Sequence, residues 1–406
     1  MKRCPECRRD YYDDSLLYCL DDGTSLLDGP AIAGMAEPAV MLPYGAYDSG
    51  RTEMPTATFD SKPSPSPADD LYFQGKFFSE RGNPADLQKA IELFEEAIAS
   101  DPNHALSYVD LARAYGTIFF FFNSDKKDLM AKSYALLQRA LAIEPDLAQA
   151  HGVKGYLLWS PANGFPHEQA IAEFQAALAL DPKLVEAHTW LAAVYFHIGL
   201  LEESEDESQT ALKLDPSKNV ARLHRAVAQS YAGRYKEALQ GFRSLPADLS
   251  SELAGSTTAW CLLNLGRVDE ASDLIRRLLV QFPADVGGQL AGVNAVVLAA
   301  KGDSSAAEAA IAEAIDKGSG FGHFHHTTHF IADTYAHMNR PADSVRYLHM
   351  TADSGFPCYP LFDNDPNLEA IRSDTEFQEF ISEQRAIWDE RIAKYGASSK
   401  HDGKAT

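Results

Sequence analysis

Three cysteines and an aspartate near the N-terminus have the spacing of a metal site. Cys4 and Cys7 form a C-x2-C pair, and Cys19 and Asp22 follow as C-x2-D after eleven intervening residues. Zinc prefers four soft or borderline ligands in tetrahedral geometry, which two facing turns can supply. Because so short a segment has almost no core, the metal would provide most of its folding free energy. The spacing predicts a structural Zn2+ ion held by these four residues; the alternative is a degenerate site without metal.

Histidines in the segment from Gly322 to His329 form a second group of potential ligands. Besides His329 the segment holds His323, His325 and His326. His325 and His329 are four positions apart, so one helical face could present two imidazoles to a metal. The glutamate of the H-E-x-x-H metalloprotease pattern is missing. Polar packing at the start of a helix explains the same residues, so a metal-dependent enzyme using His323–His329 stays a hypothesis.

Other motifs of catalysis are not found. The sequence contains no G-x-x-x-x-G-K-[ST] phosphate loop, no G-x-G-x-x-G and no G-x-S-x-G, and no kinase or cyclase motif. Cys261 and Cys358 have no evident base beside them in the sequence. The sequence therefore predicts that the protein is not an enzyme.

Composition and charge limit the partners. The 406 residues include 36 Lys and Arg against 58 Asp and Glu, a formal net charge of −22, and 45% are hydrophobic. An acidic surface repels phosphate backbones and anionic lipid, so we expect neither nucleic acid nor membrane as a partner. No apolar run approaches the roughly 20 residues that span a bilayer. The start lacks the apolar region of an export signal. With no disulfide pattern among the cysteines, a cytoplasmic location is expected.

The chain divides into five regions by composition and periodicity. They are a zinc-ribbon-like knuckle (1–29), a flexible Pro/Ala/Ser-rich linker (30–68), a helical repeat region (69–355), C-terminal capping helices (356–395) and a disordered tail (396–406).

The helical region repeats a small–large–small pattern, typified by Ala170, Phe174 and Ala177. Successive repeats start 33 to 43 residues apart, at Ala90, Ser133, Ala170, Ser204, Ala238, Ala271, Ala307 and Ser344. Small residues let two helices approach closely, and large residues fill the adjacent groove. Gly199, Gly233 and Gly266 each precede a start by five residues and are expected to end a helix in a left-handed turn.

This is the pattern of tetratricopeptide repeats (TPRs), in which two helices recur with a period of about 34 residues. One pair cannot bury its own apolar face, so pairs stack. The sequence therefore predicts an all-α fold: an α-α superhelix of about eight TPR-like helix pairs, preceded by the small zinc-ribbon-like knuckle.

The first helix of each pair lines the concave groove of a TPR superhelix. From the repeat positions, the predicted groove residues are Arg113, Tyr156, Trp159, Phe196, His197, Tyr231, Trp260 and Asn264. Aromatic residues dominate, which suits an apolar, proline-rich or helical peptide. The alternative is that several of them are core, because an error of one residue rotates a helical position by about 100°. Four consecutive phenylalanines, 119–122, either anchor a partner or cap the core.

Both ends of the chain resemble bacterial regulatory proteins. The segment Met1–Leu27 resembles a bacterial zinc ribbon of the C-P-x-C … C-x2-C-G type, found at the N-terminus of acidobacterial multidomain regulators; Asp22 replaces the fourth cysteine and Gly23 is kept. Gly355–Pro366 and the following Leu368–Asp374 are similar to the TPR tails of eukaryotic-like serine/threonine kinases and cyclase-like regulators of such bacteria. The resemblance implies a signalling context and carries over no catalytic residue.

The leading prediction is a protein- or peptide-binding TPR scaffold in bacterial signalling or regulation. The alternative is a non-catalytic regulatory subunit or sensor that acts on a separate kinase or cyclase. The sequence does not indicate the oligomeric state.

Overall fold

The computed structural model describes residues 66–81, 84–122, 127–246, 251–318 and 320–396, and the backbone of three two-residue strands near the N-terminus. The chain forms two compact units, Met1–Ser107 and Tyr108–Thr406, which are considered separately below. Among the helices that the structure describes, none combines the length and the hydropathy of a membrane span.

The first unit holds the strands and one helix pair. The strands β1 (Lys2–Arg3), β2 (Asp10–Tyr11) and β3 (Leu27–Asp28) form an antiparallel sheet in the order β2-β1-β3. The predicted ligands Cys4, Cys7, Cys19 and Asp22 lie outside the described residues, as does nearly all of the predicted linker.

The helix pair of the first unit consists of α1 (Pro67–Arg81) and α2 (Pro84–Ser100). Helix α1 begins close to the predicted start of the repeat region at residue 69. Ser66 and Asp69 cap it reciprocally, each backbone N–H donating to the other's side chain. At Gly75 an added Cβ would lie 2.6 Å from the ring of Phe94, so the absence of a side chain lets the two helices pack closely.

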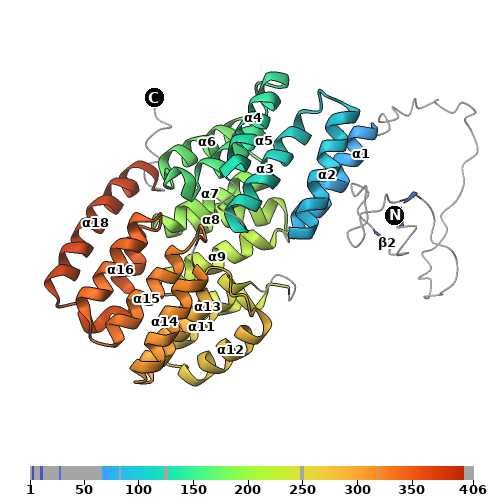
Figure 1. Cartoon of the computed structure of the whole chain (residues 1–406). Coiled ribbons are helices and arrows are strands. Elements are labelled where there is room, and N and C mark those ends of the chain that lie inside the picture. Colours follow the sequence, from blue (N-terminus) through green and yellow to red (C-terminus); the bar gives the residue numbers. More distant parts are fainter. Residues whose placement is uncertain are drawn as a thin grey trace, which may run out of the picture. The chain divides into compact units, whose positions relative to one another are not determined.

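The second unit is a series of helix pairs followed by a C-terminal segment (Figure 1). The pairs are α3 (Ala105–Phe121) with α4 (Lys127–Ile143), α5 (Ala148–Leu158) with α6 (His167–Leu180), α7 (Val185–His197) with α8 (Leu201–Leu214), α9 (Asn219–Tyr231) with α10 (Tyr235–Arg243), α11 (Glu252–Asn264) with α12 (Val268–Gln281), α13 (Gln289–Ala300) with α14 (Ser304–Gly318), and α15 (His325–His337) with α16 (Pro341–Asp353). The segment that follows contains α17 (Tyr359–Asn364), the 3-10 helix η3 (Pro366–Ile371) and α18 (Thr375–Tyr395).

Small residues hold the paired helices together at the predicted positions. All eight residues that start the repeat pattern, from Ala90 to Ser344, are 0% exposed. Where the residue is serine, its hydroxyl also donates to a backbone carbonyl of the first helix. The pairs are Ser133 with Ala112 O (2.9 Å), Ser204 with Ala192 O (2.8 Å) and Ser344 with Ala332 O (2.8 Å). The predicted all-α fold of about eight TPR-like pairs is confirmed.

The turns inside the pairs also follow the prediction. Gly199, Gly233 and Gly266 have φ of 80°, 75° and 73°, in the left-handed region that glycine adopts without strain. Asn339 has φ of 54° and lies at the corresponding position before Ser344. Asparagine is the other residue that tolerates this conformation, so the sequence signal is broader than glycine alone.

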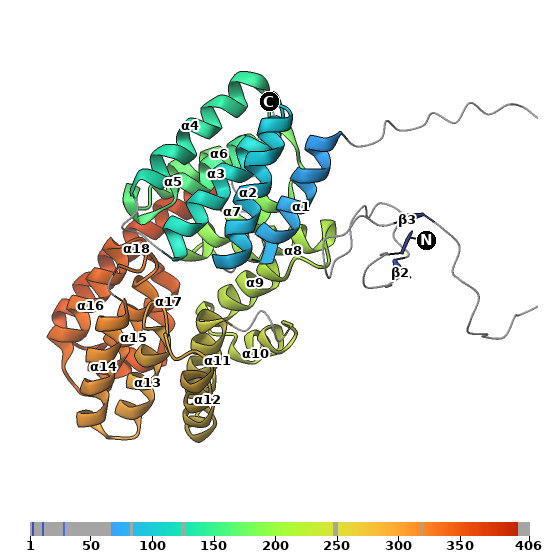
Figure 2. The same ribbon diagram turned by 45° about the vertical axis from the view of Figure 1, so that its right-hand side comes forward.

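The C-terminal segment packs back onto the repeats. Helix α18 lies beside α16 (Figure 2). The 3-10 helix η3 contacts α15, and α17 contacts α9. The indole Nε1 of Trp388 donates to Gly199 O at 2.8 Å, in the turn between α7 and α8. A Cβ added at Gly199 would lie 2.6 Å from Pro360 and 3.0 Å from Trp388. The segment therefore joins the last pair to the middle of the unit.

The close helix pairing predicts a position-specific effect of side-chain size. We expect Ala170→Leu on α6 to lower the free energy of unfolding by about 1–3 kcal/mol, because the residue is fully buried against the paired helix. Ala172→Leu on the same helix is the control, since Ala172 is exposed; its effect should stay within about 0.5 kcal/mol. Urea unfolding followed by circular dichroism measures both. Equal effects of the two substitutions would contradict the assigned packing.

Candidate functional site

Four buried imidazoles meet in the second unit. His197 ends α7, and His323, His325 and His326 come from the start of α15 and the turn before it. Taking one ring nitrogen from each residue, the four nitrogens lie within 4.8 Å of one another. His323 Nδ1 is 3.1 Å from His325 Nε2, and the Nδ1 atoms of His197 and His325 lie 2.8 Å from the carbonyls of Ala193 and Ser354. We call these four residues the histidine cluster.

Three of the rings that contact the histidine cluster, those of Trp159, Phe196 and Tyr231, belong to residues predicted to line a groove. Tyr231 OH is 3.2 Å from His326 Nδ1, and the ring of Trp159 lies 4.6 Å from that of His197. Of the predicted set, Tyr156, Trp159, Phe196, His197, Tyr231 and Trp260 are 1–6% exposed.

The prediction of an aromatic groove that is open to a partner therefore needs correcting. Its aromatic residues do face one side of the first helices, but segments of the same chain cover them. Residues 320–333 and 356–371 occupy the side where a peptide was expected. Arg113 and Asn264 are half-buried, and both are paired: Arg113 with Asp110 at 2.9 Å, and Asn264 with Asn367 at 2.8 Å. A partner could reach the aromatic side chains only if these segments moved away.

The run of phenylalanines belongs mainly to the core. Phe119 and Phe120 are buried, and the ring of Phe120 lies 4.6 Å from His323 and 5.7 Å from Tyr156. Only Phe122 is an exposed large side chain. Of the two interpretations of this run, capping of the core fits the structure.

A second polar group lies one turn further along α15. His329 Nε2 is 3.0 Å from Asp365 Oδ2 and 3.6 Å from Asp333 Oδ1. Trp260 Nε1 donates to Asp333 Oδ2 at 3.0 Å. Burial and the neighbouring Asp365 carboxylate hold the pKa of Asp333 well above its usual range. Two adjacent buried carboxylates cannot both carry a charge cheaply, so the carboxyl of Asp333 holds its proton more tightly than usual.

The histidine cluster is electrically neutral. Burial, together with the neighbouring imidazoles, lowers the pKa of His197, His323 and His326 well below the ordinary value of 6.5. Burial lowers the pKa of His325 to about 4. Neutral imidazole has a lone pair on one ring nitrogen and can bind a metal. The cysteines of this unit are not activated, because burial raises the pKa of Cys358 to about 12 and that of Cys261 as well.

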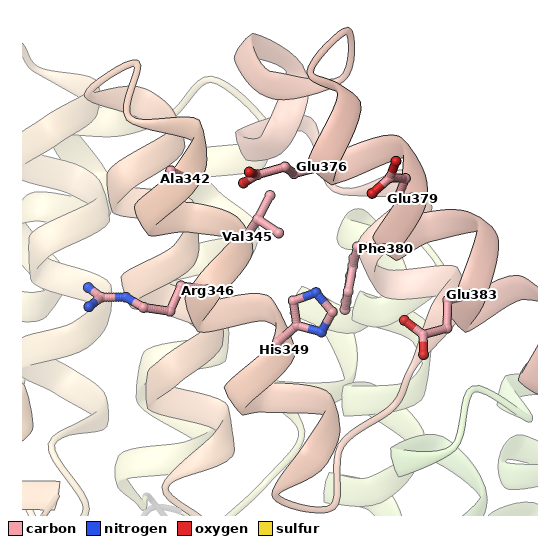
Figure 3. A pocket seen from close by; sticks show the side chains of 8 residues that line it. All are labelled: Ala342, Val345, Arg346, His349, Glu376, Glu379, Phe380 and Glu383. Atoms are coloured by element: carbon pink, nitrogen blue, oxygen red, sulfur yellow. The ribbon is translucent and has the colours of Figure 1, made fainter.

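An exposed pocket of about 350 Å³ lies between α16 and α18 (Figure 3). Val345 and Phe380 form its apolar floor, and Glu376, Glu379 and Glu383 line one side. These glutamates form no ion pair with any residue that the structure describes. Figure 3 shows Arg346 pointing away from α18 and its glutamates. The guanidinium of Arg346 pairs with Asp343 at 3.1 Å instead. The pocket is thus an acidic groove with an apolar floor.

Sequence reasoning missed both the closure of the groove and the role of His197 in the cluster. The sequence shows several histidines together in the Gly322–His329 segment, but His197 stands alone in its own repeat. Only the ring contacts of α15 with α7 and α9 reveal the cluster, because repeat periodicity describes neighbours along the stack. The C-terminal acidic groove was missed for the same reason.

Neutral buried histidines should make stability depend on pH. His224 lies outside the cluster; its Nδ1 is 3.0 Å from Thr189 O, and burial lowers its pKa to about 4. The folded pKa is below the unfolded value of 6.5, so stability is complete above that value and falls as pH drops through 6.5 towards 4. Protonation of this residue alone should lower the free energy of unfolding by about 2 kcal/mol between pH 7 and pH 5. In His224→Gln, whose amide can still donate to Thr189 O, the loss measured by urea unfolding should be smaller by that amount. An unchanged pH dependence would contradict a neutral His224.

Comparison with known proteins agrees with the helix pairs. Residues 167–199, which contain α6 and α7, match the family of the TPR repeat. No curated protein sequence matches the chain. A tetratricopeptide repeat protein from Parabacteroides merdae ATCC 43184 is 18% identical, with a TM-score of 0.41 over 62% of this chain and 93% of that one.

Other solved structures are similar at the same level. The human IFIT1 dimer with m7Gppp-AAAA is 13% identical with a TM-score of 0.50, covering 70% of this chain and 71% of that one. PilW, a type IV pilus biogenesis factor, is 20% identical with a TM-score of 0.40, covering 54% and 96%. At these identities the likeness concerns the fold. The TPR repeat model matches one segment within the stacked pairs, and the likeness to the solved structure agrees with a fold of stacked helix pairs.

Proposed function

We propose that this protein is a non-catalytic scaffold that binds another protein or peptide in a regulatory pathway. The TPR fold supports the general class, because stacked helix pairs present extended surfaces for partners. The signalling context rests on the resemblance of the two chain ends to bacterial regulators.

The acidic groove between α16 and α18 is the observation that carries a binding site. Its floor holds Val345 and Phe380, and the ring of His349 lies 4.9 Å from that of Phe380. Glu376, Glu379 and Glu383 recur at spacings of three and four, so they line one face of α18. An apolar floor beside a row of unpaired carboxylates suits an amphipathic helix with basic residues. The partner proposed here is therefore a basic amphipathic segment of another protein.

A helical peptide of leucine and lysine tests this site. Glu379→Gln with Glu383→Gln should weaken binding about threefold to tenfold, because two carboxylates that face the peptide become neutral. Asp389→Asn with Glu390→Gln makes the same change of net charge on the same helix outside the pocket, and should alter binding less than about twofold. Fluorescence anisotropy at two salt concentrations gives the dissociation constants. Equal weakening by both pairs would mean that the peptide senses only the net charge of −22 and would remove the proposed site.

The N-terminal knuckle is proposed to hold one zinc ion through Cys4, Cys7, Cys19 and Asp22. The described strands β1 and β2 flank Cys4 and Cys7 in the sequence and pair antiparallel, as expected for a hairpin with a C-x2-C turn. The combined Cys4→Ser and Cys7→Ser substitution should remove one equivalent of zinc. It should also remove the zinc–sulfur distance of about 2.3 Å from the X-ray absorption spectrum. Full-length protein without any zinc–sulfur signal after growth with added zinc would refute the knuckle.

A further inference from the structure

The four rings of the histidine cluster are almost equally spaced. The six distances between ring centroids of His197, His323, His325 and His326 lie between 4.8 and 5.8 Å. Four points with nearly equal mutual distances form a tetrahedron. Four imidazoles bound to one zinc at 2.0–2.1 Å would have their nitrogens about 3.3 Å apart and their ring centres about 5 Å apart. The rings therefore already have the spacing of a tetrahedral metal site.

Backbone carbonyls fix two of these rings in the tautomer that a metal requires. The Nδ1–H of His197 donates to Ala193 O, and that of His325 donates to Ser354 O, each at 2.8 Å. The proton on Nδ1 leaves the lone pair on Nε2 of each ring. Metal-binding histidines commonly donate their other N–H to a carbonyl in this way.

One nitrogen of the cluster lacks a partner. His197 is 2% exposed, and its Nε2 is buried without a hydrogen bond. A buried acceptor without a partner costs free energy, so it calls for a ligand. Its ring lies 5.1 to 5.5 Å from each of the other three histidine rings. A cation between the four rings would satisfy this lone pair.

The geometry points to a single zinc ion bound by His197, His323, His325 and His326. Neutral imidazole and tetrahedral geometry both suit zinc. His323 Nδ1 and His325 Nε2 are already 3.1 Å apart, and the remaining ligand atoms lie within 4.8 Å. Side-chain shifts of about 1 Å would bring all four to coordination distance.

The surroundings make this a closed, structural site. Trp159, Phe165 and Phe356 are buried and contact the rings of the cluster. Four protein ligands leave no coordination position for water or substrate, in contrast to catalytic zinc. The ion would join α7 to the start of α15, and so fasten the covered inner face. This site is independent of the scaffold function proposed above.

The neighbouring group of His329, Asp333 and Asp365 is not assigned a second ion. Asp365 Oδ1 accepts hydrogen bonds from the backbone and side-chain nitrogens of Asn367, and Asp333 Oδ2 accepts one from Trp260. Protein donors thus already satisfy most of its oxygens.

Metal analysis in a full-length chain with Cys4→Ser and Cys7→Ser tests the site, since the knuckle cannot then contribute. After growth with added zinc this variant should retain one equivalent, with nitrogen at about 2.0–2.1 Å and no sulfur at about 2.3 Å in X-ray absorption. Adding His197→Phe, which keeps an aromatic ring but no nitrogen, should remove that equivalent. His224→Phe is the matched control, because His224 is also buried and is not one of the four ligands; zinc should be retained.

Three results would overturn the assignment. They are a folded cysteine variant with far less than one equivalent of zinc, a bound zinc whose spectrum requires sulfur, and retention of zinc in the His197→Phe variant. The spectrum of the cysteine variant does not depend on the histidine substitutions, so it stays decisive if His197→Phe does not fold. Loss of the knuckle's zinc leaves this test unchanged.

Discussion

The burial of the inner aromatic face against the chain's own C-terminal half is the contact on which the second unit depends. The first helices α5, α7, α9 and α11 carry large rings on this face. Left in water, such a face would forfeit about 25 cal/mol for each Å² of apolar surface. Helix α15 and residues 356–371 cover it. This covering fixes the positions of α17 and η3, and it leaves the outer surface of the unit as the part that a partner can reach.

The polar side chains of this interior specify how its parts fit. Tyr231, Trp260 and Asn264 each contact a polar partner on or after α15: His326, Asp333 and Asn367. A buried polar group that loses its partner costs about 1–3 kcal/mol, so a shift of α15 by one residue would be penalised several times over. Apolar packing alone would tolerate such a shift more readily. In this interior, apolar burial drives the packing, and the polar pairs determine which position α15 takes.

Local rules predicted the helix pairs well and the site only in part. The small positions and the turn glycines follow from contacts within one pair, so Ala170 and Gly199 could be assigned from spacing alone. The inward orientation of Trp159 and Trp260 also follows from the repeat. What covers them does not, because Asn264 and Asn367 are 103 positions apart and belong to no common period. His197 joins the cluster for the same non-periodic reason.

The hydrogen bond from Trp388 to Gly199 changes the connectivity of the array. In an open row of repeats each unit touches only its neighbours, and the ends can fray while the middle persists. Here α18 returns to the turn between α7 and α8, so the last helix is also a neighbour of the third pair in its unit. The helix pairs between α7 and α18 are therefore connected at both ends, and none of these pairs is a free end of the array. Contacts between distant positions also raise the contact order, so this part of the chain is expected to fold more slowly and more cooperatively than a linear TPR array of the same length.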